Sequence, residues 1–255
     1  MLHYDAEGGR ATITIDDPER MNPLANETMV ELVAAVHRAT RDSEVRVVVI
    51  TGAGDRAFSA GGDLSGGFVD SPIVDHAARG ALADLFRALR RCGKPTVARV
   101  NGHALGGGFG LAAACDITIA VDTATLGTPE INVGLWPMMI SAVLMPLVSR
   151  KALLEMMLTG RRIRADEAEE LGIVNRVVPA AGLDAAVDEV VDALLAQSPA
   201  ALALGKEAFY AIADLDFDTA LDHLHNGLTA IAMTEDAVEG VTAFVEKRTP
   251  HWHGR

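Results

Sequence analysis

The sequence predicts an α/β fold that ends in a helical segment. Two observations predict it. β-Branched runs alternate with helical patterns as far as about residue 180, and the β pattern then disappears. The composition agrees, because 49% of the 255 residues are hydrophobic and 22% are charged, as in a globular protein with a large core. We expect an α/β core over residues 1–195 and a helical oligomerisation segment over residues 196–255.

The first elements can be justified one by one. Residues 11–15 alternate like a strand, and residues 26–41 carry apolar side chains at helical spacing. Residues 45–51 form a β-branched run that glycines end, which predicts a buried strand. Residues 77–92 have helical spacing and stop before a glycine and a proline. The later strands are expected at 96–100, 116–121 and 173–178, and the later helices at 105–114, 138–149, 150–158, 165–171, 183–196, 199–213, 219–233 and 235–246.

Charge and cysteine content restrict the possible partners and the compartment. The formal net charge is −13, and there is no long basic run that could neutralise the phosphates of a nucleic acid. A small phosphate-bearing molecule remains compatible, because a few local donors can hold it. The two cysteines cannot form a disulfide framework, the N-terminus carries no charged-then-apolar signal, and no apolar run reaches the ~20 residues of a membrane span. We therefore predict a cytoplasmic protein that binds neither nucleic acid nor a membrane.

Two patterns resemble cofactor or metal sites but lack a feature that such sites require. Residues 52–57 match the loose dinucleotide pattern GxGxxG/A, but a glycine-rich loop follows them where that pattern requires a helix. His223 and His225 have a spacing that places the two side chains on different faces of a helix, and His251 and His253 lie in a terminal tail, where we expect them to be exposed to solvent. The sequence predicts neither a Rossmann nucleotide site nor a metal site.

A second glycine cluster, over residues 101–110, lies between a predicted strand and an alanine-rich helix. Its three consecutive glycines can serve close helix–sheet packing, or they can leave backbone N–H groups free at a helix N-terminus. The loop at residues 58–67 also follows a strand and can offer a further N–H. Two backbone donors aimed at one oxygen would stabilise an enolate or a tetrahedral oxyanion.

Several segments resemble one family. AFSAGGDL at 57–64 resembles a loop of the enoyl-CoA hydratases and isomerases, the crotonase family, and NGHALGGG at 101–108 with ACD at 114–116 is similar to their glycine signature. TPE at 128–130, LTG at 158–160 and FVEKR at 244–248 follow in the family's order. The resemblance implies a spiral of strand–strand–helix units and an acyl-CoA substrate. It also implies a homotrimer or dimer of trimers, and no cofactor apart from CoA as the substrate's handle.

The resemblance also implies roles for individual residues. The two oxyanion N–H groups fall on Gly62 and Gly107. The residues that would hold CoA are Arg56, Ala60, Asp63 and Leu64, with Lys247 and Phe244 reaching a neighbouring subunit's nucleotide. Ser65 stands where relatives have a second lysine.

The family's two glutamates are represented unequally. Glu130 corresponds to the proton carrier at the α carbon, whereas Gly110 replaces the glutamate that helps to activate water. Met138 and Met139, in a stretch where relatives are rich in glycine, could line an acyl pocket or simply pack in the core. Three functions follow: an enoyl-CoA hydratase or isomerase, another enolate reaction such as decarboxylation or thioester hydrolysis, and a non-catalytic acyl-CoA-binding protein.

Overall fold

The computed structural model describes residues 1–64 and 76–255, so Ser65 lies outside the described residues. The strands are β1 Leu2–Glu7, β2 Arg10–Ile15, β3 Val47–Gly52, β4 Ala57–Ser59, β5 Thr96–Val100, β6 His103–Leu105, β7 Ile117–Val121, β8 Thr125–Gly127, β9 Arg162–Arg164 and β10 Arg176–Val178. The helices are α1 Asn26–Arg41, α2 His76–Arg79, α3 Ala81–Arg91, α4 Gly107–Ala114, α5 Met138–Leu144, α6 Arg150–Thr159, α7 Ala165–Glu170, α8 Leu183–Leu195, α9 Pro199–Ala211, α10 Phe217–Ala232 and α11 Glu235–Glu246. Short 3-10 turns are η1 Pro18–Arg20, η2 Pro129–Val133 and η3 Ala180–Gly182.

Within the described residues the strands form two sheets. The larger sheet has the order β1-β2-β3-β5-β7-β10, with β1 and β2 antiparallel and the other neighbours parallel. The smaller sheet has the order β4-β6-β8-β9, and only its β8–β9 pair is antiparallel. Every residue of β3 is buried, as a strand between two layers of helices requires. The mixed α/β class predicted from the sequence is confirmed.

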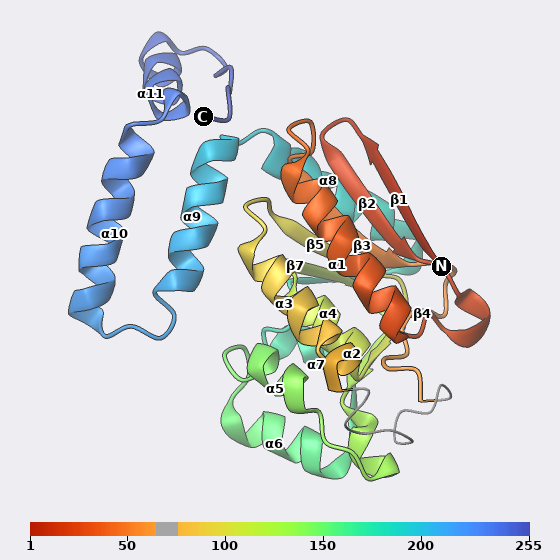
Figure 1. The fold of residues 1–255 in the computed structure, drawn as a ribbon. Helices are drawn as coiled ribbons and strands as arrows, with labels where there is room; N and C mark the ends of the chain where they lie inside the picture. The colour runs from red at the N-terminus through yellow and green to blue at the C-terminus, as the bar shows by residue number, and fades with distance from the viewer. Residues whose placement is uncertain (65–75) are drawn as a thin grey trace.

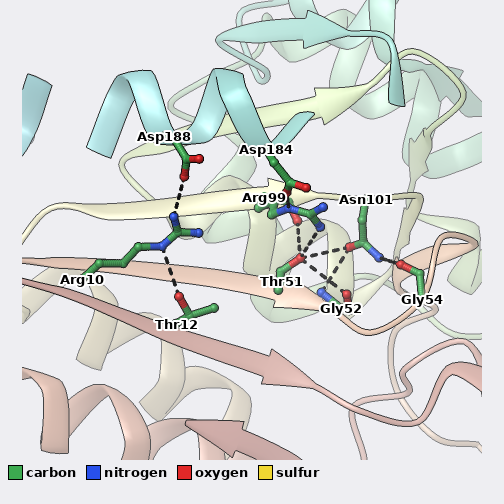
Figure 2. Close-up of polar contacts among 9 residues, drawn as sticks. All are labelled: Arg10, Thr12, Thr51, Gly52, Gly54, Arg99, Asn101, Asp184 and Asp188. Atoms are coloured by element: carbon green, nitrogen blue, oxygen red, sulfur yellow. Dashed lines mark hydrogen bonds and ion pairs between the residues drawn. The ribbon is translucent and has the colours of Figure 1, made fainter. Parts of the chain in front are cut away.

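Helices cover both faces of the larger sheet, with α1 and α3 on one face and α8 on the other (Figure 1). Two ion pairs fasten α8 to the sheet. Arg10 contacts Asp188 at 2.7 Å, and Arg99 contacts Asp184 at 2.8 Å (Figure 2). Apolar side chains fill the space between these layers. One of them, Ile13 of β2, faces α1 and is fully buried.

The helices α9, α10 and α11 extend to one side of this core (Figure 1). Asp116, which follows α4, accepts hydrogen bonds from Lys206 Nζ at 2.6 Å and Tyr210 Oη at 2.8 Å, and so ties α9 to the core. These two contacts give Asp116 a structural role. No helix in residues 1–64 or 76–255 is long and apolar enough to cross a membrane.

Several predicted boundaries were wrong. The helix expected at 105–114 begins at Gly107, because residues 103–105 pair with β4 and β8 as a strand. The helix expected at 77–92 is divided at Gly80, the one at 138–149 ends at Leu144, and the strand expected at 173–178 is formed only by its last three residues. The strands β1, β4, β6, β8 and β9 were not predicted.

Candidate active site

One pocket, with a volume of about 1280 Å3, lies where the small sheet meets α4 and α5. Gly62, Gly107 and Glu130 all line it. They follow β4, β6 and β8 respectively, which are neighbouring parallel strands. Because the carboxyl ends of parallel strands meet at one edge of a sheet, three segments far apart in the sequence converge there.

The first expected donor, Gly62, belongs to a short parallel bridge with Leu24. The Leu24 N–H donates to the Gly61 carbonyl at 2.7 Å, and the Asp63 N–H donates to the Leu24 carbonyl at 3.4 Å. The bridge therefore uses the groups on either side of the Gly62 N–H and leaves that N–H to the pocket. A methyl group built on Gly62 would meet no atom of the described residues within 4 Å.

The second expected donor, Gly107, is the first residue of α4, and the N–H groups of a first helical turn have no partner inside the helix. Gly106 precedes it with φ 53° and ψ −125°, a conformation that favours glycine. The Gly106 N–H donates to the Gly127 carbonyl at 2.8 Å, which joins this turn to β8. A methyl group on Gly107 would lie 3.8 Å from the Gly62 nitrogen. The two proposed donors are therefore close neighbours.

Close packing explains another glycine of the cluster. A methyl group on Gly108 would lie 2.5 Å from the Ser59 carbonyl oxygen, so only glycine lets α4 approach β4 this closely. Both explanations left open by the sequence hold, each for a different residue: Gly108 serves packing, and Gly107 lines the pocket.

Glu130 lies in η2, two residues after the fully buried Thr128. A methyl group on Gly106 would come within 2.9 Å of Glu130 Oε1, so the carboxylate rests against the turn that carries the second donor. Glu130 Oε2 is buried and has no hydrogen-bond partner among the described residues. Desolvation by burial raises the pKa of Glu130 above the ordinary value of 4.5. An ionised carboxylate in this setting is a good proton acceptor.

The rest of the pocket wall is mainly apolar near α5. Met138 is 72% exposed and Met139 partly buried, and both line the pocket. Core packing therefore does not explain Met138. Arg162 of β9 also lines the pocket and was missed by sequence reasoning.

Apolar side chains occupy the space beside Gly110, which lies one turn after Gly107 in α4. A Cβ on Gly110 would lie 2.9 Å from Phe86 Cζ and 3.1 Å from Ile140 Cγ1. A polar side chain at this position would first have to displace the Phe86 ring.

The residues expected to hold CoA fall into two groups. Ala60, Asp63 and Leu64 line the pocket. Arg56 is not among the lining residues, and its guanidinium donates to the carbonyls of Pro18, at 2.5 Å, and Glu19, at 3.2 Å. Lys247 is not among the lining residues either. It follows α11 with φ 56°, in the helical segment that extends to one side of the core (Figure 1).

The chain matches known proteins over nearly its whole length. A family model described as enoyl-CoA hydratase/isomerase matches residues 5–255. Carnitinyl-CoA dehydratase from Escherichia coli K12 is 36% identical, over 100% of this chain and 98% of the relative. Short-chain-enoyl-CoA hydratase from Clostridium acetobutylicum is 35% identical, over 96% and 94%. The crystal structure of an enoyl-CoA hydratase from Mycobacterium smegmatis superposes with a TM-score of 0.95 at 35% identity, over 99% of this chain and 98% of that one.

Proposed function

Because the chain belongs to the enoyl-CoA hydratase/isomerase family, we propose that it moves a proton at the α carbon of an acyl-CoA thioester. One observation carries the proposal: two backbone donors and a buried carboxylate oxygen without a partner among the described residues line the same pocket. Ala60, Asp63 and Leu64, which line the same pocket, would hold the CoA portion. In an assembly of several copies of the chain, we propose that Arg56 and Lys247 bind the phosphates of CoA.

The proposed reaction begins at the thioester carbonyl. Its oxygen accepts hydrogen bonds from the Gly62 and Gly107 N–H groups, which stabilise the negative charge that develops there. The α C–H bond breaks, its electron pair forms the enolate, and Glu130 takes the proton. Returning that proton to the γ carbon of the conjugated system shifts the double bond. The transfer neither oxidises nor reduces the substrate overall, so we propose that no redox cofactor takes part.

A double-bond shift is the reaction we favour, because apolar side chains of Phe86 and Ile140 fill the space beside Gly110, the position that the family resemblance assigns to a second glutamate. Reversible dehydration of a 3-hydroxyacyl-CoA is the second candidate. The names of the two relatives, a dehydratase and a hydratase, favour it. In that reaction Glu130 would take the α proton and return it to the departing hydroxyl.

A panel of CoA thioesters separates these reactions. The purified protein is incubated with 2-enoyl-, 3-enoyl-, 3-hydroxyacyl- and malonyl-type esters, and the products are separated by chromatography and identified by mass and by conjugated-thioester absorbance. Interconversion of 2- and 3-enoyl esters is expected. Loss or gain of water would instead select dehydration or hydration, and release of carbon dioxide or free CoA would contradict both candidates.

Ligand binding gives a further prediction. An acyl-CoA at 100 times its dissociation constant should stabilise the protein by about 2.7 kcal/mol, because it binds the folded state alone. NAD should leave the melting temperature unchanged, since the glycines at 52–57 lead into β4 and not into a helix. A thermal-shift measurement in which NAD stabilises and acyl-CoA does not would refute the site.

We also propose a cytoplasmic homotrimer or dimer of trimers, held by α10 and α11. These helices expose large apolar side chains to solvent, among them Leu228 at 66% and Phe244 at 84%.

Light scattering should give three or six times the chain mass of 26.8 kDa. Leu228→Glu should dissociate the assembly, because it buries an unpaired charge. Val30→Glu, an exposed change on α1, is the control and should not. A monomeric wild type would contradict the proposal.

A further inference from the structure

We infer that the segment at residues 20–24, named here the 20–24 turn, positions the Gly62 donor, and that Asn22 is its positioning residue. The inference rests on the proposed function, since it concerns the N–H that would hold the thioester oxygen. Asn22 does not line the pocket. It acts through the backbone of the loop that follows β4.

The direct connection runs through one peptide group. The Gly61 carbonyl and the Gly62 N–H belong to the same planar trans peptide, in which the oxygen and the hydrogen point in opposite directions. The Leu24 N–H holds that carbonyl at 2.7 Å. This bond fixes the direction of the Gly62 N–H and, by polarising the peptide, makes it a stronger donor.

The 20–24 turn reaches the loop through an uncommon backbone conformation. Met21 and Asn22 are consecutive non-glycine residues with φ values of 63° and 54°. Such residues persist only where the surroundings determine them, and asparagine tolerates this region better than most. The conformation directs the Met21 carbonyl to the Ala60 N–H at 2.8 Å. The strained pair therefore turns the chain so that its next groups meet the loop.

The Asn22 side chain holds this conformation from inside. Asn22 is 1% exposed. Its Oδ1 accepts from the Asp17 N–H at 2.9 Å, and its Nδ2 donates to the carbonyls of Ala53 at 3.0 Å and Ala57 at 2.8 Å. One side chain of the 20–24 turn thus joins Asp17, which precedes the turn, to the start of β4.

A second asparagine completes the support. Asn101 Nδ2 also donates to the Ala57 carbonyl, at 3.2 Å, while its other contacts reach the Gly52 N–H and the Gly54 carbonyl (Figure 2). Beyond Gly62, Arg20 Nη2 pairs with Asp63 at 2.9 Å. The asparagines hold the start of β4, which leads into the loop with the proposed donor, and the Arg20–Asp63 pair holds the residue directly after Gly62.

The main test is Asn22→Gly, because glycine keeps the positive φ without strain and removes only the three side-chain bonds. We expect kcat to fall at least about tenfold, a part of the 10²–10³-fold loss caused by deleting an oxyanion donor, with little change in KM. The second readout is the infrared carbonyl band of a bound acyl-CoA carrying 13C at the thioester. Its shift to lower frequency on binding should be smaller in the variant than in the wild type.

The control is Asn175→Gly at the edge of the large sheet, where Asn175 accepts from the Thr118 N–H at 2.7 Å. It should change the melting temperature only. If Asn22→Gly does not fold, Arg20→Gln serves instead. Arg20 is exposed, so the fold should survive, and a smaller band shift with up to about fivefold lower kcat is expected.

Two results would overturn the inference, and they differ. A wild-type band shift that Asn22→Gly and Arg20→Gln both retain, with unchanged kcat, would show that the 20–24 turn has only a structural role. No band shift in the wild type would remove the oxyanion site itself, and the proposed function with it.

Discussion

Replacing Glu130 by glutamine should lower turnover by about 10²–10⁴-fold, the usual contribution of a positioned acid or base, and should change acyl-CoA affinity little. Glutamine keeps the size of the side chain and its contact with Gly106 but cannot take a proton. The measurement is uptake of deuterium from solvent at the α carbon of a bound acyl-CoA. Wild type should exchange that hydrogen rapidly and the variant should not.

The pH dependence supplies an independent check. Burial raises the pKa of Glu130 above 4.5, so the carboxylate is lost by protonation at a higher pH than for an exposed glutamate. The kcat/KM of the wild type should therefore fall as the pH is lowered through that raised pKa. Equal deuterium uptake in wild type and Glu130→Gln would show that another group is the base.

Replacing Gly107 by proline should lower turnover by at least roughly 10²-fold, as expected for the loss of one oxyanion donor. Proline lacks the N–H, yet it suits the first position of a helix, so α4 has reason to survive the change. CoA binding should persist, because the residues proposed to hold it lie outside α4. Turnover and CoA affinity are measured on the same folded preparation.

Gly107→Ala is the matched control for this variant. It adds the same Cβ, 3.3 Å from Leu24 Cδ1, but keeps the N–H. Alanine should therefore show the cost of crowding, and the further loss in proline should measure the donor. Equal turnover in the two variants would mean that the Gly107 N–H contributes nothing to the reaction.

The sequence predicted the large sheet better than the small one. The helix at 26–41 and the strand at 96–100 were found with the correct bounds, because each has a long apolar pattern that one structure satisfies. The small-sheet strands β4, β6, β8 and β9 have three residues each. So short a run shows no periodicity, and these strands exist because they pair with segments distant in the chain.

The site shows the same division. The motifs placed Gly62, Gly107 and Glu130, and the structure brings all three to one pocket. What fills the space beside Gly110 could not be read from the chain, since Phe86 and Ile140 reach it from other helices. Asn22 did leave a signal, as an asparagine before a proline is typical of a turn. That signal says nothing about which loop the turn would support.

The succession of β4, β6 and β8 has a consequence for how this protein can change over generations. Each strand delivers one group of the site, and adjacent strands are held about 4.8 Å apart by backbone hydrogen bonds that do not depend on side chains. A mutation or insertion after β8 can therefore move the proposed proton carrier while the backbone hydrogen bonds between β4, β6 and β8 stay in place. With Gly62 and Gly107 binding the carbonyl oxygen as proposed, carbonyl binding and the choice of the reacting carbon depend on different loops, which substitutions can change separately.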